Sequence, residues 1–200
     1  MTTAIPGLEI RRPVLVDLAP AVRWRSVAFV VGGALLTAAA AQIRISTGIS
    51  PVPITGQTFA VLLCGAGLGA SRGAASQALY WTLGAIGLPF YTGGEGGWEA
   101  AIGSTGGYLA GFVVAAFVIG LLAERGQDRQ LLTSIPAMLA GTAIIYAMGA
   151  GWLAHDLGVP VSSATERDAL SLGVTPFLVG DAIKLVLAGS LCPLAWRLVR

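Results

Sequence analysis

Six apolar stretches follow one another along the chain, separated by short segments rich in charged residues, glycine or proline. A helix rises about 1.5 Å per residue, so it needs about 20 residues to cross the hydrocarbon core of a membrane. The first stretch and the last three reach this length, whereas the second and third are shorter and are separated by the turn GASRG. The pattern predicts spanning helices with a tight helical hairpin among them. The stretches cover residues 24–43, 57–70, 73–91, 104–123, 131–153 and 176–197.

The second stretch is the weakest of the six predicted spans. It ends in GAGLG, whose glycines lower its helix propensity, and a re-entrant segment at this point would leave five spans. We predict six spans, forming an all-α integral membrane bundle over residues 24–197. A cytoplasmic N-terminal segment over residues 1–23 precedes it, and both parts belong to a single membrane domain, residues 1–200.

The composition agrees with a membrane protein. Hydrophobic residues make up 55% of the chain and charged residues only 11%, whereas soluble domains carry about 25% charged residues. The net charge of +2 gives no indication of binding to nucleic acid. The N-terminal RRPVLVDLAPAVRWR and the apolar run after it are similar to a signal peptide. A retained first span is favoured, because the basic region is long and includes Asp17.

The basic residues are distributed unevenly between the two sides of the predicted bundle. If both termini are placed on one side, that side holds nine of the twelve Lys and Arg residues. The opposite loops hold only Arg44 and Arg167, and the last basic residue, Lys184, lies inside the final span. Since cytoplasmic loops carry an excess of Lys and Arg, both termini are predicted to be cytoplasmic. The nine residues are Arg11, Arg12, Arg23, Arg25, Arg72, Arg125, Arg129, Arg197 and Arg200.

Two ionisable residues, Asp181 and Lys184, interrupt the last apolar stretch. An ionisable side chain at bilayer depth costs roughly 2.5–3.5 kcal/mol on insertion scales. Residues three positions apart lie on one face of a helix, so these side chains are predicted to share an inward stripe with Phe177 and Ala188. One interpretation is a buried ion pair that only neutralises itself, which is a poor source of stability. The favoured interpretation is that a polar ligand completes the site.

Two loops on the side opposite to the termini have unusual compositions. STGISPVPITGQT contains two prolines, which stiffen an extended backbone. GLPFYTGGEGGWEAAIGSTGGY carries eight glycines between Gly87 and Gly107, and glycine lets backbone amides approach a ligand closely. Long loops in compact proteins are often lids or binding loops. Both are interpreted as binding loops rather than as flexible connectors.

The sequence has none of the motifs expected of an enzyme. It contains no phosphate-binding loop of the form GxxxxGK[ST] and no HExxH motif, and a single histidine cannot build a metal cluster. Cys64 and Cys192 lie in apolar runs without the spacing of a metal or redox site, so they are interpreted as buried free thiols. We predict no enzymatic activity, no cofactor and no metal.

Five ordered motifs give the chain a resemblance to the BioY family, the substrate-binding S components of energy-coupling-factor vitamin transporters that handle biotin. The resemblance extends from about residue 25 to residue 197. It implies a six-helix bundle in the prokaryotic inner (plasma) membrane, with cytoplasmic termini and a biotin pocket toward the outer face. The motifs are PVPITGQT at 51–58, LGAIGLP at 83–89, GGEGG at 93–97, GSTGGY at 103–108 and PFLVGDAIK at 176–184.

The same resemblance implies which residues bind biotin. Asp181 can accept a hydrogen bond from a ureido N–H group, while Lys184 can donate to the ureido carbonyl or to the carboxylate. The sequence leaves these two options for Lys184 open. The other implied binding residues are Gln57, Gly94, Glu95, Thr105, Gly106, Gly107 and Tyr108.

The resemblance also implies partners, namely a transmembrane coupling subunit and two ATPase subunits on the cytoplasmic side. In the first span, Ala34 and Ala38 form a small-xxx-small pair that allows close helix approach in lipid. Spacing alone supports internal packing and docking equally, and the implied partners favour docking. The alternative function is an S component for another vitamin, such as thiamin or riboflavin.

Three positions depart from the family pattern. Gly56 stands where a leucine is usual and is expected to loosen the outer loop, and Ser104 replaces a common proline before Thr105. Glu95 puts a negative charge where an anionic vitamin would enter. This charge argues against a direct contact by the Glu95 side chain.

Overall fold

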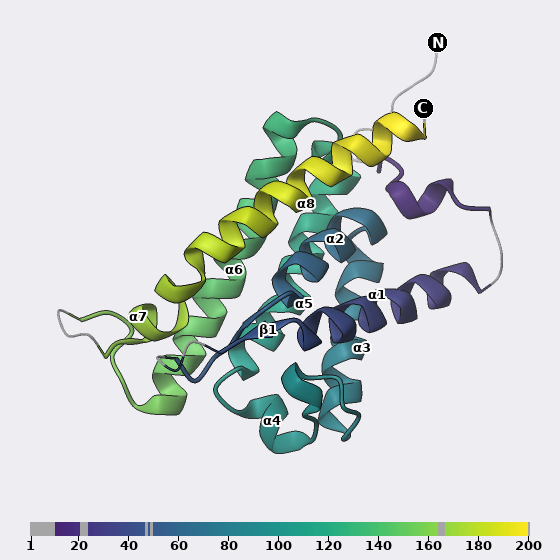
Figure 1. The fold of residues 1–200 in the computed structure, drawn as a ribbon. Coiled ribbons are helices and arrows are strands. Elements are labelled where there is room, and N and C mark those ends of the chain that lie inside the picture. Colours follow the sequence, from purple (N-terminus) through teal and green to yellow (C-terminus); the bar gives the residue numbers. More distant parts are fainter. Residues whose placement is uncertain (1–10, 21–23, 47, 49, 164–166, 200) are drawn as a thin grey trace, which may run out of the picture.

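Six main helices form the bundle in the part of the chain that the computed structural model describes, which is residues 11–20, 24–46, 48, 50–163 and 167–199 (Figure 1). Each main helix coincides with one of the six apolar stretches. The hairpin predicted between the second and third stretches is present, with Gly69 as the single residue between its helices. The helices are α1 (Arg25–Gln42), α2 (Gln57–Leu68), α3 (Ala70–Ala85), α5 (Gly106–Glu124), α6 (Leu131–Leu157) and α8 (Leu178–Leu198).

The connections contain short regular elements that the apolar pattern does not predict. Two strands pair antiparallel in the Pro-rich loop, with Arg44 opposite Thr55 and Ile45 opposite Ile54. The Gly-rich loop contains one short α-helix and one 3₁₀ turn. These elements are η1 (Leu15–Leu18), β1 (Arg44–Ile45), β2 (Ile54–Thr55), η2 (Thr92–Gly94), α4 (Trp98–Ile102), η3 (Gln127–Arg129), α7 (Ala169–Gly173) and η4 (Thr175–Phe177).

Helix α5 lies at the centre of the bundle and packs against α2, α3 and α6. Its sequence is apolar on nearly all sides, as expected of a helix that is buried all round. Glycine permits the closest of these contacts. A Cβ atom at Gly120 would overlap the backbone of Gly69 and Ala70 at the α2–α3 turn, so α5 approaches the hairpin backbone directly.

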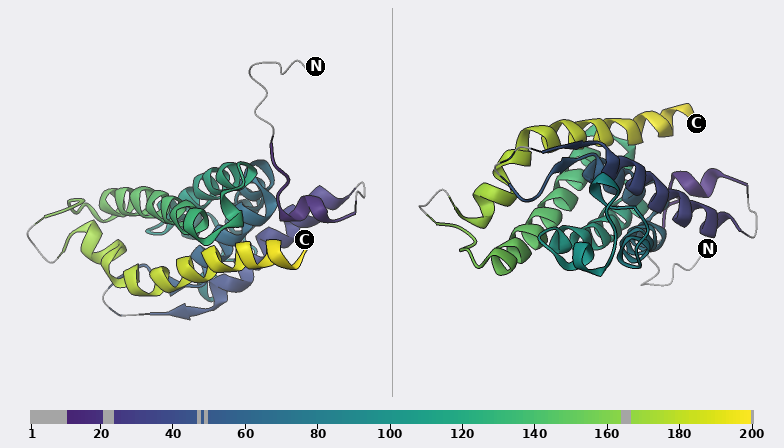
Figure 2. Two further views of the ribbon diagram at one scale, coloured as in Figure 1. Left: turned by 90° about the horizontal axis from the view of Figure 1, so that it is seen from above. Right: turned by 60° about the horizontal axis from the view of Figure 1, so that its bottom comes forward.

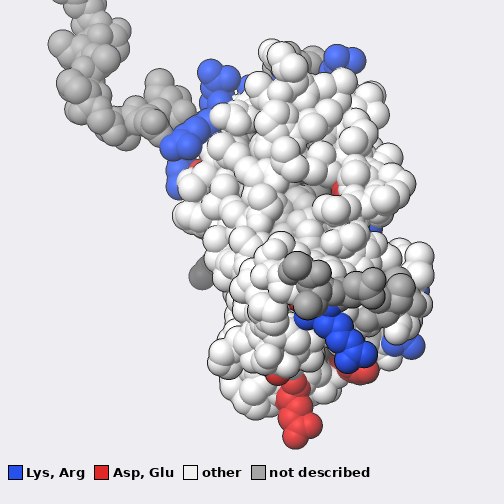
Figure 3. Space-filling view, turned by 90° about the vertical axis from the view of Figure 1, so that its left-hand side faces the viewer, with Lys and Arg blue, Asp and Glu red and all other residues white. Residues whose placement is uncertain are grey.

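Within the described residues, four helical segments are long and apolar enough to cross a membrane: Arg25–Gln42, Gly106–Glu124, Leu131–Leu157 and Ala169–Leu198. Helix α2 is a shorter apolar helix. The face in Figure 3 has few charged atoms over its middle, and Lys, Arg, Asp and Glu gather toward its two ends. The chain is therefore an all-α, multi-pass membrane protein, while the count of six spans stays a prediction.

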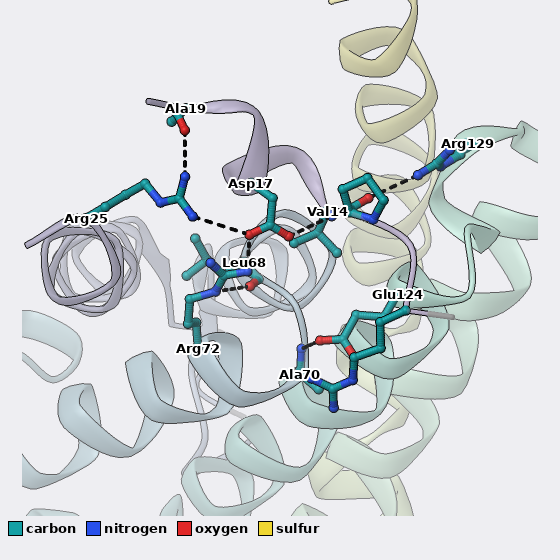
Figure 4. Close-up of polar contacts among 11 residues, drawn as sticks. Val14, Asp17, Ala19, Arg25, Leu68, Ala70, Arg72, Glu124 and Arg129 are labelled. Atoms are coloured by element: carbon teal, nitrogen blue, oxygen red, sulfur yellow. Dashed lines mark hydrogen bonds and ion pairs between the residues drawn. The ribbon is translucent and has the colours of Figure 1, made fainter. Parts of the chain in front are cut away.

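Residues 11–20 of the N-terminal segment pack against the bundle (Figure 4). Val14 is buried, and the Asp17 carboxylate accepts a 2.8 Å hydrogen bond from Arg72 of α3 and pairs with Arg25 of α1 at 3.8 Å. Partial burial raises the pKa of Asp17, but bonds from Arg72 and the Val14 amide outweigh it, so the pKa lies below its usual value. Residues 11–20 thus lie at the same end of the molecule as the end of α8 (Figure 1).

The expected docking role of Ala34 and Ala38 is corrected by their burial. Ala34 is 1% exposed and Ala38 is 8% exposed, and both lie in the core on the side of α1 that faces the bundle. Their neighbour Thr37 donates a hydrogen bond to Gln77 of α3 at 3.2 Å. The small residues therefore serve the internal packing of α1, and its exposed face is formed by larger apolar residues such as Val31 and Leu35.

Candidate functional site

Asp181 and Lys184 form a direct ion pair on the inner face of α8. The Lys184 Nζ lies 2.5 Å from Asp181 Oδ1, and the two side chains are 18% and 6% exposed, respectively. Phe177 and Ala188 are buried on the same stripe. The predicted inward stripe is therefore confirmed, and it follows from the i, i+3 spacing on a helix.

The remaining polar atoms of this pair are bonded to three other elements. Lys184 Nζ donates to the carbonyl oxygen of Thr55 in β2 at 2.6 Å and to Thr58 Oγ1 in α2 at 3.3 Å. Asp181 accepts hydrogen bonds from Thr58 Oγ1 at 3.1 Å and from the hydroxyl of Tyr146 in α6 at 2.7 Å. A buried charge pair is tolerated when its lone pairs and protons are satisfied in this way.

A cavity of about 270 Å³ opens beside the ion pair. This volume lies near the lower end of the ~300–1,000 Å³ typical of small-molecule sites. Its walls combine an apolar surface with polar groups at the α8 wall and at the two unusual loops. The apolar and aromatic lining includes Val52, Tyr91, Leu109, Phe112, Ile145 and Phe177, and the polar lining includes Arg44, Ser46, Ser50, Thr55, Gln57, Thr58, Thr92, Glu95, Thr105, Tyr108, Tyr146, Asp181 and Lys184.

The strand pair places the Pro-rich loop beside the N-terminal half of α8 (Figure 2), and Ser50, Val52 and Thr55 of this loop line the cavity. Gly56 follows β2, and its amide donates to the carbonyl oxygens of Ala40 and Ile43. A Cβ atom at Gly56 would lie 2.8 Å from the Ala40 carbonyl oxygen. The expectation that Gly56 loosens the loop is therefore wrong, because the absence of a side chain lets the loop bond tightly to the end of α1.

Six of the nine predicted binding residues line the cavity: Gln57, Glu95, Thr105, Tyr108, Asp181 and Lys184. Gln57 is buried, and its amide donates to the Tyr80 hydroxyl at 2.6 Å and accepts from Thr55 Oγ1 at 2.8 Å. The Tyr108 hydroxyl donates its hydrogen to the carbonyl oxygen of Gly173 at 2.7 Å. The ring of Tyr108 is therefore the part that can contact a ligand at the cavity wall.

The other three predicted residues, Gly94, Gly106 and Gly107, are not among the described residues that line the cavity. A Cβ atom at Gly107 would overlap the side chain of Trp152, and one at Gly106 would lie 3.2 Å from the indole nitrogen of the same residue. These two glycines let the start of α5 approach α6. Their place in the structure is at a helix contact beside the cavity-lining Thr105 and Tyr108.

Sequence reasoning missed Tyr146, Thr58 and Arg44. Tyr146 carries a hydroxyl in the middle of an otherwise apolar stretch, and this isolated polar group was a usable signal. Thr58 directly follows Gln57 in the PVPITGQT motif. Arg44 was noted only in the charge count, and its position on the cavity depends on a strand register that the apolar pattern does not contain.

Comparison with known proteins agrees with this arrangement. The BioY family model matches residues 14–200, so the chain belongs to the BioY family. A biotin transporter BioY from Thermotoga maritima is 42% identical over 147 residues, covering 72% of this chain and 80% of that protein. One from Rhodobacter capsulatus is 41% identical over 143 residues, covering 69% and 75%.

A solved structure is also similar. The crystal structure of the S-component for biotin from an ECF-type ABC transporter matches with a TM-score of 0.75 and 25% sequence identity. The match covers 86% of this chain and 91% of that chain. The bundle and its order of helices are therefore those of this structural class.

Proposed function

We propose that the protein is the biotin-binding membrane subunit of a vitamin uptake transporter. The observation that carries the proposal is the Asp181–Lys184 pair on the wall of a cavity that has both apolar and polar surfaces. Biotin combines a ureido group, an apolar thioether ring, an aliphatic chain and a carboxylate. Asp181 is suited to accept ureido N–H groups, and Phe112, Ile145 and Phe177 offer the ring an apolar surface.

The proposed binding residues are those predicted from the sequence, together with Thr58 and Tyr146. Thr58 and Tyr146 bond directly to Asp181 and so fix the orientation of its carboxylate. For Gly94, Gly106 and Gly107 we propose an indirect role, in which the absence of side chains shapes the loop and the start of α5. Glu95 lies on the cavity wall, but its charge opposes that of an anionic ligand.

The proposed topology has six spans, formed by α1, α2, α3, α5, α6 and α8, with both termini in the cytoplasm of a prokaryotic cell. In support, four arginines lie at the end of the molecule where residues 11–20 pack. Arg25 and Arg72 pair with Asp17. The Arg129 side chain donates to the carbonyl oxygen of Pro13, and the Arg12 amide donates to the carbonyl oxygen of Glu124. Arg23 and Arg200, also assigned to this side, lie outside the described residues. The cavity and Arg44 lie toward the opposite end, which we assign to the outer face of the plasma membrane.

The proposed partners are a transmembrane coupling subunit and two ATPase subunits. The sequence has no phosphate-binding loop of its own, so ATP hydrolysis to drive uptake requires another chain. We infer that the protein is a binding and transport subunit and not an enzyme. The exposed face of α1, which includes Val31 and Leu35, is the proposed docking side in place of Ala34 and Ala38.

The experiment is equilibrium binding of biotin to the purified protein, with thiamin and riboflavin as competitors. We expect biotin alone to bind, because the Asp181–Lys184 pair suits its ureido group. Uptake of labelled biotin by cells with and without the coupling subunits then tests the transport role. Binding of thiamin or riboflavin in preference to biotin would contradict the proposal.

A further inference from the structure

Two cations, Lys184 and Arg44, line the cavity among the residues that the structure describes. The ammonium group of Lys184 has three N–H donors, and three acceptors already lie within 3.3 Å of it, on Thr55, Thr58 and Asp181. The carboxylate of Asp181 also offsets its charge at 2.5 Å. Lys184 is therefore poorly placed to neutralise a second carboxylate brought by the ligand.

Arg44 differs from Lys184 in its exposure and in having no carboxylate of the described residues beside it. It is exposed, and within the described ranges no carboxylate lies at ion-pair distance from its guanidinium. Its backbone pairs with Thr55 in the β1–β2 ladder. Its guanidinium lies against the α-carbon of Gly93 in η2, where a Cβ atom would overlap it. Gly93 has a φ of +78°, so glycine serves both the turn and the close approach.

The charges on the cavity wall give the ligand a direction. The Asp181–Lys184 pair is neutral overall and the ammonium donors are already bonded, so an anionic group beside it would lose its hydration without gaining a counter-charge. The uncharged ureido end can approach Asp181 without this penalty and can donate to it. The carboxylate end then points away from α8, toward the loops that carry Arg44.

We propose that Arg44 recognises the carboxylate of the ligand and that the Asp181–Lys184 pair recognises its uncharged polar head. This inference rests on the proposed binding of biotin and settles which end of the ligand faces Lys184. A guanidinium matches a carboxylate with two parallel N–H donors. Glu95 lines the same cavity and weakens the binding of an anion, so Arg44 and Glu95 together set the selectivity for charge.

The test compares two ligands on the purified full-length protein by calorimetry: biotin and biotinamide, in which a carboxamide replaces the carboxylate. Arg44→Gln is expected to weaken biotin binding by about tenfold, the loss of one charge-assisted contact, and biotinamide binding by less than about twofold. Arg44→Lys should restore part of the affinity for biotin. Arg167→Gln removes the same charge from an outer loop away from the cavity and should change neither affinity.

Glu95→Gln provides the opposite test, because it is expected to strengthen biotin binding and leave biotinamide unchanged. Equal weakening of both ligands by Arg44→Gln would overturn the inference and assign Arg44 a role in loop folding. Unchanged binding of both ligands would overturn it as well. Wild-type protein that binds neither ligand would overturn the proposed function itself, and this result is distinguishable from both outcomes above.

Discussion

The Lys184 ammonium donates a 2.6 Å hydrogen bond to the carbonyl oxygen of Thr55, a residue 129 positions earlier in the chain. This bond joins the last helix to the β1–β2 strand pair of the Pro-rich loop. Lys184, a charged residue within an apolar helix, thus also holds a wall of the cavity in place. Loss of the Lys184 charge is therefore expected to affect both the ligand and the loop.

Replacing either partner of the ion pair is expected to weaken biotin binding. Asp181→Ala and Lys184→Ala each leave the other charge of the pair uncompensated and remove a charge-assisted hydrogen bond, which is worth about 1.5–3 kcal/mol. We expect at least about a tenfold loss of affinity for each variant by calorimetry. Glu99→Ala is the matched control, since Glu99 is an exposed acid on α4 that does not line the cavity. Unchanged affinity in both site variants would refute their role.

The hydroxyl of Tyr146 is expected to contribute to affinity through Asp181. Tyr146→Phe removes the 2.7 Å hydrogen bond to Asp181 Oδ2 and keeps the ring. A net loss of about 1 kcal/mol corresponds to roughly a fivefold weaker affinity for biotin. Thermal unfolding in the absence of ligand should be measured in parallel. An affinity equal to that of the wild type would show that Asp181 does not depend on this bond.

Gly120 is expected to be intolerant of substitution. In Gly120→Ala the new methyl group would overlap backbone atoms of Gly69 and Ala70, which cannot turn aside as a side chain can. We expect a loss of about 1–3 kcal/mol, seen as a lower unfolding temperature in detergent. Gly67→Ala is the control, because a Cβ atom there meets nothing within 4 Å and alanine favours the helix. Equal stability of the two variants would contradict the close packing of α5.

Bulky residues at Ala34 and Ala38 are expected to damage the fold rather than transport alone. Both positions are buried against the bundle, and overpacking costs about 1–3 kcal/mol. The double variant to leucine should unfold at a lower temperature and bind less biotin. Leu35→Ala on the exposed face of α1 should leave binding intact and reduce uptake if the coupling subunit docks there. Full stability of the double variant would restore the docking role of the alanines.

Asp17 is expected to stabilise the packed N-terminal segment in a pH-dependent manner. Its pKa is lower in the folded protein, so its contribution is present above the usual aspartate value of about 3.9. The contribution is lost as the pH falls through the lower folded pKa. Its side chain is 32% exposed, so Asp17→Asn is expected to cost no more than about 1 kcal/mol.

The measurement for Asp17 is the unfolding temperature of both proteins between pH 7 and pH 3. The difference between wild type and Asp17→Asn should be largest at neutral pH and shrink below about pH 4. Glu99→Gln, which removes one acidic charge at an exposed position outside residues 11–20, serves as the control. A difference that grows toward acidic pH would contradict the assigned direction of the pKa.

The six main helices and the inward stripe of α8 could be predicted from the sequence, because both follow from local periodicity. The length of each apolar stretch predicts a helix, and the i, i+3 spacing puts Asp181 and Lys184 on one face of the last helix. The strand pair was missed because two-residue strands carry no periodic signal. Contacts such as Tyr146 with Asp181 depend on how α6 and α8 pack, which no local pattern contains.

The role of the small residues in α1 shows where spacing is ambiguous. A small-xxx-small pair allows close approach to any helix, whether it belongs to the same chain or to a partner. Only the position of α1 against α3, with Gly33 packed on Ser76, decides between the two. In the same way, Gly106 and Gly107 belong to a recognisable motif, but their contact with Trp152 depends on the packing of α5 against α6.

The most direct test of the central claim is the structure of the protein with bound biotin. We predict that the ureido ring lies at hydrogen-bond distance, about 2.7–3.2 Å, from the carboxylate of Asp181, inside the cavity walled by α8 and β2. Biotin bound elsewhere on the molecule, or with its ureido ring out of reach of Asp181, would contradict the account.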